Sequence, residues 1–326
     1  MTELFAHPVL FASVLMAMLL FGTLSYFAMR AAKAKRVRVK AINARAKRAR
    51  MTYDDFAGEY RKAFEALENK GYCVLDLIHD LSDENRARDG AHQFIAYEEA
   101  SYLCEKIRRS KTSPLLLILH TLGGYSFPSE MIANAIKKHP GKKDAYVPYV
   151  AMSGGTVISL ATDKIHMGKD AFLGPIDTQY KGYPAVAFDQ LKKEKHPDAI
   201  SDEVLLTSYM VDQHKLSALQ RAMSVLNEKH QVKGDKEFVV RELMDKGRHH
   251  AEPISAKEAE RIKINVDTIV PPDVYALVDA RLGMLRTFDH KNELPPRPVE
   301  IAAAQPASLF REIEPFGHPD LPPGVI

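Results

Sequence analysis

The sequence predicts an α/β protein with a parallel sheet, preceded by one transmembrane helix at the N-terminus. Compact apolar runs alternate with helical patterns from residue 72 to residue 168, which is typical of βαβ units. The run 114–120 (PLLLILH) is almost continuously apolar, as in a strand that is buried on both faces of a sheet. Residues 4–29 carry no formally charged side chain and are long enough to cross a membrane.

The membrane span is predicted over residues 8–29. Only Glu3 carries a charge before it, whereas ten Lys and Arg residues and no acidic residue lie between Arg30 and Arg50. A cleaved secretory signal would have basic residues before its apolar region, which is the opposite order. By the positive-inside tendency we expect a single-pass protein with its N-terminus outside and all that follows in the cytoplasm. The basic run is expected to lie on anionic lipid headgroups.

Charge and cysteine content argue against several classes of function. Removing the ten basic charges from the formal net charge of +3 leaves −7, so nucleic acid is not an expected partner. Two cysteines, Cys73 and Cys104, are too few for a disulfide framework or a zinc cluster. No histidine pair has metal-ligand spacing with a supporting carboxylate, and no phosphate-binding glycine loop is present. Neither a metal nor a cofactor is therefore expected.

The predicted elements follow one another in a regular order. The first helix, within residues 51–71, places Phe56, Tyr60, Phe64 and Leu67 on one face and stops at Gly71. Strands are then expected at 72–78, 114–120, 145–151 and 164–168. Helices are expected at 94–109, 129–139, 154–162, 203–231 and 235–247. From residue 295 the chain is rich in proline and is expected to be extended or disordered.

Two loops at the carboxyl ends of predicted strands form the candidate site, because ligands bind at that edge of parallel sheets. In the first, HTLGGYS, Gly123 and Gly124 let the backbone come close to a ligand. In the second, AMSGGT, Ser153 follows a strand and opens a helix, so the amides of the next glycines point into the same space. A hydroxyl beside free N–H groups suits acyl transfer. The alternative interpretation is that Ser153 only caps the helix and that the glycines are turn residues.

The order of the motifs resembles a known family. A T-x-G-G loop is followed about thirty residues later by AMSGGT, then by ATDKIHMG and by LGPIDTQ. This order is similar to the Clp protease and crotonase superfold. In detail it resembles the serine dehydrogenase proteinase family of membrane-associated, Clp-like serine peptidases, and more distantly the signal peptide peptidase A family. The resemblance covers residues 70–275 and implies stacked, Clp/crotonase-like βαβ units.

With this resemblance the chain divides into four predicted parts. Residues 1–30 are the transmembrane anchor, and 31–70 are the basic juxtamembrane segment with the amphipathic helix. Residues 71–290 are expected to be a Clp-like serine peptidase domain. Residues 291–326 are the proline-rich tail.

The resemblance also implies roles for individual residues. Ser153 would be the nucleophile, and the oxyanion hole would combine the backbone N–H of Gly154 with that of Gly123 or Gly124. Reaction through an acyl-enzyme at this serine needs no cofactor.

The remaining members of the implied triad stand in exchanged positions. The Clp peptidases have a histidine at the end of the segment that reads LGPID here, and this chain has Asp177. His250, in GRHHAEPI, matches an H-x-x-P-I pattern of the Clp-like membrane family. The implied order is Ser153, Asp177 and His250, with His250 as the general base and Asp177 orienting its imidazole.

Lysine is a rival base. Signal peptide peptidases use a lysine that is desolvated enough to accept a proton, which gives a Ser-Lys dyad. Lys192, Lys193 and Lys195 lie about forty residues after Ser153, although this cluster reads first as a solvated loop. Lys215 is a further candidate.

The other histidines are expected to have structural roles. His120 directly precedes the Gly-Gly loop and is expected to order it through a hydrogen bond. His79, His166 and His214 are expected to be structural or surface residues.

Two functions remain open from the sequence. The leading hypothesis is a membrane-anchored, cytoplasm-facing serine endopeptidase that cleaves unfolded segments or proteins at the membrane. The alternative is a catalytically inactive, Clp-like, membrane-tethered oligomeric scaffold or peptide-binding module. A crotonase-type acyl-CoA enzyme is less favoured, because crotonases do not need a serine at a helix start. By resemblance we expect a homo-oligomer.

Overall fold

The computed structural model describes residues 29–30, 33, 35–36, 46–82, 94–176, 179–180, 183–230, 236–244 and 252–287. The chain divides into two compact units, Met1–Asp55 and Phe56–Ile326. Except for Met29, the predicted membrane span lies outside the described residues, as does the whole proline-rich tail. Within the described ranges no helix is both long and apolar enough to cross a membrane. The N-terminal anchor therefore stays a prediction.

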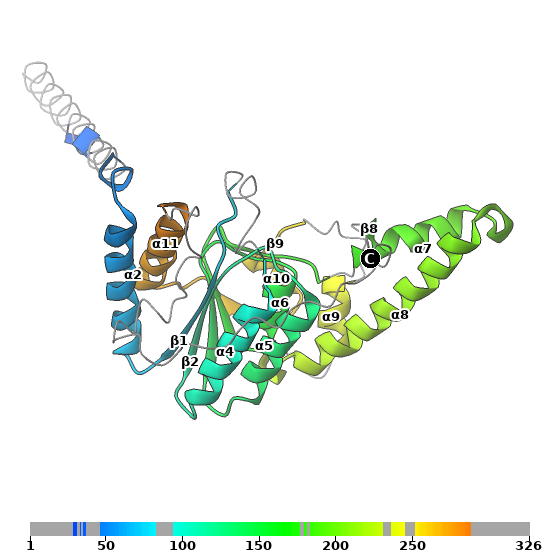
Figure 1. The fold of residues 1–326 in the computed structure, drawn as a ribbon, viewed down its shortest axis with the longest axis horizontal. Helices are drawn as coiled ribbons and strands as arrows, with labels where there is room; N and C mark the ends of the chain where they lie inside the picture. The colour runs from blue at the N-terminus through cyan, green and yellow to red at the C-terminus, as the bar shows by residue number, and fades with distance from the viewer. Residues whose placement is uncertain are drawn as a thin grey trace, which may run out of the picture. The chain divides into compact units, whose positions relative to one another are not determined.

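A five-stranded parallel sheet forms the centre of the second unit (Figure 1). In spatial order its strands are β1 (Cys73–Ile78), β2 (Leu115–His120), β3 (Lys143–Val147), β5 (Lys164–Met167) and β10 (Val266–Asp267). Each neighbouring pair is parallel. The predicted parallel α/β architecture is confirmed, and the continuous apolar run of β2 is buried as expected.

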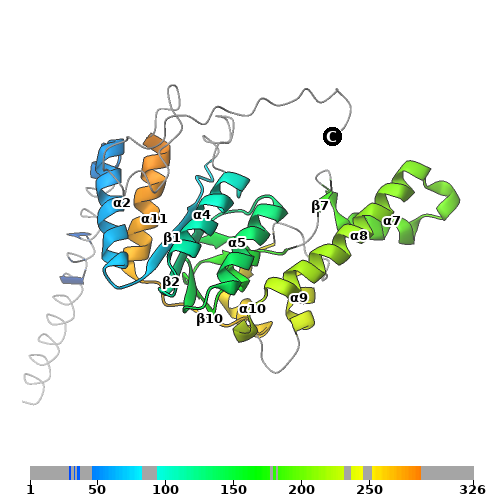
Figure 2. The same ribbon diagram turned by 60° about the horizontal axis from the view of Figure 1, so that its bottom comes forward.

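Helices cover both faces of this sheet (Figures 1 and 2). One face carries α4 (Tyr97–Arg109), α5 (Ser126–Lys138) and α6 (Gly154–Leu160). The other carries α11 (Pro272–Thr287) and α2 (Tyr53–Glu68), which lie side by side in both views. These two helices approach closely, since a Cβ on Gly283 would lie 2.3 Å from the Phe56 ring.

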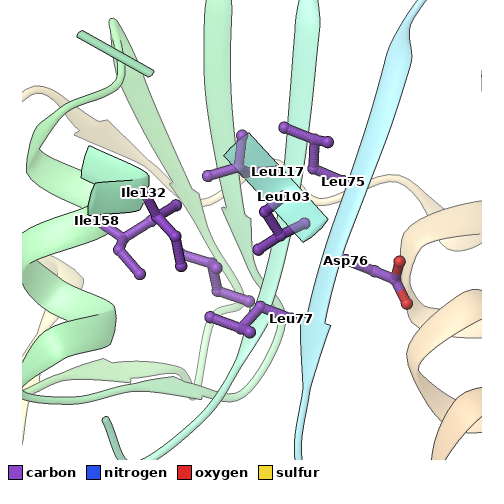
Figure 3. A pocket seen from close by; sticks show the side chains of 8 residues that line it. Leu75, Asp76, Leu77, Leu103, Leu117, Ile132 and Ile158 are labelled. Carbon is purple, nitrogen blue, oxygen red and sulfur yellow. The ribbon is translucent and has the colours of Figure 1, made fainter. Parts of the chain in front are cut away.

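Leucine and isoleucine side chains fill the space between the sheet and α4, α5 and α6. Those around a small void in this core include Leu75, Leu77, Leu103, Leu117, Ile132 and Ile158 (Figure 3). The void has a volume of about 10 Å³, at most one water molecule, so the core is closed to ligands. Asp76 points to the opposite face of β1, where its carboxylate accepts a hydrogen bond of 3.0 Å from the Tyr60 hydroxyl.

The strand predicted at 145–151 is divided in the structure. β3 ends at Val147, and β4 (Val150–Ala151) belongs to a separate sheet with β6 (Phe172–Leu173) and β9 (Ile254–Ser255). The physical reason is Pro148, which has no N–H with which to continue the ladder. After this break β4 pairs with Thr121 instead. The redirected chain therefore delivers Ser153 to the carboxyl end of β2.

Two helices next to this edge begin at positions other than those predicted. α4 begins at Tyr97 rather than at residue 94, because Ile95 forms a bridge with Gly124 of the Gly-Gly loop. α5 begins at Ser126, three residues before the predicted start. Its third residue is Pro128, which the first turn of a helix tolerates.

The long helices predicted after residue 200 are present as α8 (Asp202–Val225) and α9 (Lys236–Met244). An unpredicted helix, α7 (Ala185–Glu194), forms a hairpin with α8 and follows the two short strands β7 (Gln179–Tyr180) and β8 (Tyr183–Pro184) (Figure 1). The short helix α10 (Ala256–Arg261) was not predicted either. The second half of α8 packs against α5, which brings this helix to the edge of the candidate site.

Candidate active site

Ser153 lies in a strained turn between β4 and α6. Its φ and ψ angles are 49° and −116°, and a positive φ is uncommon for any residue other than glycine. The side chain stands at the N-cap position of α6 but makes no capping hydrogen bond. The geometry therefore does not support the interpretation of Ser153 as a simple helix cap. Backbone strain of this kind is concentrated at functional sites.

The Gly-Gly loop lies directly against this turn. Gly123 has a φ of +106°, and a Cβ on it would lie 2.7 Å from the Cβ of Ser153 and 2.9 Å from the carbonyl oxygen of Met152. A Cβ on Gly124 would lie 2.2 Å from the backbone nitrogen of Ile95. Neither position has room for a side chain, so both glycines are needed for this close approach.

Two backbone N–H groups at this turn, those of Gly154 and Gly124, have no hydrogen-bond partner among the described residues. Gly154 is the first residue of α6, where an N–H group has no acceptor within the helix. The N–H of Gly123, by contrast, donates to Oγ1 of Thr121 at 3.0 Å. Of the two loop glycines, Gly124 is therefore the one with an available donor in this structure.

The start of α6 is also pressed against α5. A Cβ on Gly154 would lie 2.2 Å from Oγ of Ser129. Ser129 is buried, and its hydroxyl donates to the carbonyl oxygen of Tyr125 at 2.9 Å. Packing thus requires glycine at position 154, independently of any use of its N–H group.

A cleft of about 570 Å³ opens at Ser153. Its walls come from the Gly-Gly loop, the starts of α5 and α6, Ile176 and one face of α8. The polar side chains that line it include those of Ser126, Ser129, Glu130, Ser153, His214, Ser217 and Arg221. Ligand pockets usually have volumes of about 300–1,000 Å³, so this cleft can hold part of a peptide.

The contribution of α8 to the cleft was not predicted from the sequence. His214, Ser217 and Arg221 stand at helical spacing and line the cleft together. His214 was expected to be a structural or surface residue; it is exposed, as expected, and it also lines the cleft at Ser153. The spacing of polar residues along 203–231 was the available signal, but nothing in the sequence indicated that this face would turn toward the Gly-Gly loop.

An ion pair joins the two helices that border the cleft. Nε of Arg221 on α8 lies 2.5 Å from Oε1 of Glu130 on α5. Burial raises the pKa of the Glu130 carboxyl above its usual range, and the Arg221 guanidinium partly opposes this effect. The pair places one cation and one carboxylate on the cleft wall.

The segment before Asp177 is held beside the cleft. The Thr156 hydroxyl lies 2.8 Å from the carbonyl oxygen of Ala151 and 2.9 Å from that of Gly174, and it accepts the Gly174 N–H at 3.1 Å. Ile176 lines the cleft, and its N–H donates to the carbonyl oxygen of Leu243 at 3.1 Å. This fastens the segment to α6 on one side and to α9 on the other.

Two members of the predicted triad, Asp177 and His250, lie outside the described residues. Their placement and their roles stay predictions. Ile176 immediately precedes Asp177 and reaches the cleft, whereas the described chain stops at Met244 before His250.

The rival lysines are not among the described residues that line the cleft. Nζ of Lys192 lies 2.7 Å from Asp212, and Nζ of Lys215 lies 2.5 Å from Asp189. Both ion pairs tie α7 to α8. The cluster predicted to be a loop is instead the last turn of α7 and the residue that follows it, with Lys193 and Lys195 exposed.

His120 does not have the role expected for it. Its ring packs edge-on against Tyr149 with centroids 5.6 Å apart, and its Nδ1 has no hydrogen-bond partner in the described part of the chain. Burial, helped by nearby His79 and Arg286, lowers the pKa of His120 to about 4, so the ring is neutral at pH 7. The hydrogen bond that orders the Gly-Gly loop comes from the next residue, Thr121.

The other predicted structural histidines agree with the prediction. Nδ1 of His166 lies 2.8 Å from Asp267, and Tyr146 stacks on the His166 ring. His79 is fully buried between Thr121 and Glu99. Across the described ranges no group of three or more His, Cys, Asp or Glu side chains could hold a metal ion.

Comparison with known proteins assigns this sequence to a family. The family model of ClpP-like SDH-type serine proteinases matches residues 50–305. The uncharacterized protein MJ0137 of Methanocaldococcus jannaschii is 33% identical over 221 residues, which cover 67% of this chain and 77% of that protein. The uncharacterized protein MJ1495 of the same organism is 32% identical over 219 residues, which cover 66% and 73%.

Similar solved structures include an alanine mutant of the 1510-N membrane-bound stomatin-specific protease, with a TM-score of 0.38 and 16% identity over 64% of this chain and 83% of that one. A mutant of ClpP1 from Listeria monocytogenes has a TM-score of 0.38 and 11% identity, covering 62% of this chain and 93% of that one. Since the family model spans well over half of the sequence, this chain belongs to the family of ClpP-like SDH-type serine proteinases.

Proposed function

We propose that this protein is a serine endopeptidase that hydrolyses peptide bonds through an acyl-enzyme at Ser153. The observation that carries the proposal is the strained Ser153 turn, beside which the N–H groups of Gly154 and Gly124 have no hydrogen-bond partner among the described residues. The cleft of about 570 Å³ at this turn supplies space for a substrate. Membership in a serine proteinase family supports the same reaction.

Each step of the reaction uses a feature of this turn. Oγ of Ser153 attacks the carbonyl carbon of the scissile bond while a general base takes its proton. The N–H groups of Gly154 and Gly124 donate to the oxyanion that forms. The base then gives the proton to the leaving amine, which leaves an acyl-enzyme. A water molecule, deprotonated by the same base, hydrolyses this ester and frees Ser153.

We assign the base to His250 and its orientation to Asp177. The support is indirect: Ile176 reaches the cleft immediately before Asp177, and its N–H donates to α9, the helix that precedes His250. His214 is the competing candidate because it already lines the cleft. A lysine base is disfavoured, because Lys192 and Lys215 are engaged in ion pairs between α7 and α8.

A fluorophosphonate probe tests the nucleophile. The wild-type protein should form a covalent adduct, located at Ser153 by peptide mass spectrometry, and Ser153→Ala should not react. Ser126→Ala and Ser217→Ala are matched controls, because both remove a serine hydroxyl from the same cleft. They should react like the wild type. Equal labelling of Ser153→Ala and wild type would refute the proposal.

The inactive scaffold makes the opposite prediction for substrate turnover. A peptidase should cleave casein or a short fluorogenic peptide in a manner that depends on Ser153. A scaffold should assemble and hold partners while Ser153→Ala changes nothing. The size of the assembly, measured by analytical ultracentrifugation, tests the proposed homo-oligomer in the same samples.

We also propose that residues 1–30 anchor the peptidase in a membrane and hold its active site in the cytoplasm. The support is the uncharged segment and the ten basic residues that follow it. The full chain should resist extraction from membranes at alkaline pH, and a chain that lacks residues 1–30 should be extracted. Degradation of the catalytic domain by protease added outside intact cells would refute the orientation.

A further inference from the structure

We propose that Glu99, which is partly exposed, and the buried His79 and Thr121 form a hydrogen-bonded chain, the His79 relay, that positions the Gly-Gly loop for catalysis. The inference rests on the proposed function, since the position of the loop matters for reaction at Ser153. All three are positioning residues: they act on the oxyanion donors through the backbone and do not touch the substrate.

The relay is continuous in the structure. Nδ1 of His79 lies 2.8 Å from Oγ1 of Thr121. Nε2 of His79 lies 3.2 Å from each carboxylate oxygen of Glu99. His79 and Thr121 both have 0% exposure. Buried polar groups are found where their hydrogen bonds are satisfied, and here both ring nitrogens have a partner.

A carboxylate, an imidazole and a hydroxyl in this order are also the groups of a nucleophilic triad. The burial of Thr121 excludes that use, because a hydroxyl with no exposed surface cannot meet a substrate. Oγ1 of Thr121 instead accepts the N–H of Gly123 at 3.0 Å. Through this hydrogen bond the three residues therefore determine the conformation of the Gly-Gly loop.

The donors and acceptors of the relay agree along its length. In the His79 tautomer with its proton on Nε2, that N–H donates to the Glu99 carboxylate and Nδ1 accepts the Thr121 hydroxyl. The Thr121 oxygen then uses a lone pair for the Gly123 N–H. This engages the Gly123 N–H, whereas the Gly124 N–H has no acceptor within the described part of the chain.

Thr121 also holds the strand that carries the nucleophile. Its N–H donates to the carbonyl oxygen of Val150 at 3.0 Å, and its carbonyl oxygen accepts the N–H of Met152 at 3.0 Å. The side chain thus holds the Gly-Gly loop while the main chain holds the residue before Ser153. One buried residue therefore sets the position of the oxyanion donors relative to the nucleophile.

The opposite side of the loop is held by the start of α4, which also supplies Glu99. The N–H of Ile95 donates to the carbonyl oxygen of Gly123 at 2.9 Å. Oε2 of Glu99 accepts the N–H of Ala96 at 3.3 Å. Glu99 thus connects the two sets of hydrogen bonds that hold the loop. One set runs through His79 and Thr121, and the other runs through the backbone before α4.

Two substitutions at Thr121, made in the full-length chain, test the relay. Thr121→Val removes the hydroxyl but keeps a methyl group where Cγ2 limits the space beside Gly155. Thr121→Ser keeps the hydroxyl and loses that methyl. The readouts are the rate of fluorophosphonate labelling, kcat and KM on a fluorogenic peptide, and hydrogen–deuterium exchange of the 119–126 backbone.

We expect Thr121→Val to lower kcat and the labelling rate by about 10- to 100-fold, because misplaced oxyanion donors cost that much. KM should stay unchanged, and the amides of 119–126 should exchange faster. Thr121→Ser should restore both the rates and the slow exchange. If Thr121 had a purely structural role, Thr121→Val would lower the melting temperature but would not lower kcat selectively while KM stays unchanged.

Ser110→Ala is the matched control. It removes a hydroxyl that lies 3.0 Å from Nε2 of His139, a second histidine–hydroxyl pair, at the far ends of α4 and α5. Its rates and loop exchange should equal those of the wild type. The relay is refuted if Thr121→Val reacts at the wild-type rate and its loop exchanges as slowly. If the wild type does not react with the probe while Thr121→Val alone speeds loop exchange, the relay stands and the peptidase proposal fails.

Discussion

Substitution of Gly123 by alanine should damage both stability and the proposed activity. The new Cβ would lie 2.7 Å from the Cβ of Ser153, 2.9 Å from the carbonyl oxygen of Met152 and 3.0 Å from the nitrogen of Gly154. Two of these neighbours are backbone atoms, which cannot rotate away. The third belongs to the proposed nucleophile, so any relaxation moves the Ser153 turn itself.

The expected loss of stability has two parts. A non-glycine residue held at the φ of +106° costs about 1–3 kcal/mol. Overpacking against neighbours that cannot give way costs about 1–3 kcal/mol more. The sum, about 2–6 kcal/mol, is a large fraction of the 5–15 kcal/mol typical of a folded domain.

Two other glycines separate these parts. Gly71 has a φ of +87° and nothing within 4 Å of a Cβ, so Gly71→Ala should show the conformational cost alone. Gly58, exposed within α2, has an ordinary φ and open space, so Gly58→Ala should stabilise the protein by up to about 1 kcal/mol. Urea unfolding followed by circular dichroism measures all three variants. Equal losses for Gly123→Ala and Gly71→Ala, or an unchanged labelling rate for Gly123→Ala, would refute the reasoning.

Three further predictions concern individual side chains. With the fluorogenic peptide, His250→Ala should lower kcat by about 10²- to 10⁴-fold and His214→Ala should lower it by much less. The reverse result would identify His214 on α8 as the general base. The pKa of His120 is depressed to about 4 from 6.5, so between pH 6.5 and pH 4 the unfolded chain binds more protons than the folded chain. The free energy of unfolding should therefore fall by about 3 kcal/mol as the pH drops through this range. His120→Phe should lack this loss in urea unfolding at pH 7 and pH 4, and a parallel loss in both proteins would contradict it. Arg221→Met should raise the pKa of Glu130 further. It should lower the free energy of unfolding, measured with urea, by only about 0.5–1 kcal/mol, because the ion pair is partly exposed. A larger loss would show that Arg221 does more than join α5 to α8.

The main sheet was predictable because its strands carry a strong local signal. β1 and β2 are apolar almost throughout, and each is followed by a recognisable helix. β6, β9 and β10 have two residues each, which is too short for any periodicity to be detected. Their strand conformation depends on pairing with distant segments, and a short window of sequence contains no information on that pairing.

The same distinction divides the candidate site. Ser153 and the paired glycines were identifiable because each stands where a predicted strand ends, and their roles depend on the adjacent backbone. The contribution of α8 was not identifiable, since it depends on how a helix some sixty residues later packs against α5. The partners of His79 stand 42 and 20 residues away along the chain, so the sequence shows only an isolated histidine.

The hydrogen bond to the Gly-Gly loop that was expected from His120 comes from Thr121, and this difference has a simple physical cause. Successive side chains of a strand point to opposite faces, so two neighbours at the end of β2 enter different environments. His120 meets Tyr149, which hydrogen-bonds to Asp279 of α11, whereas Thr121 meets His79. A histidine before a glycine loop is the more conspicuous hydrogen-bonding residue, yet here the strand register gives the smaller hydroxyl the contact with the loop. The preorganisation of the proposed oxyanion hole therefore depends on strand register, which residue type alone does not reveal.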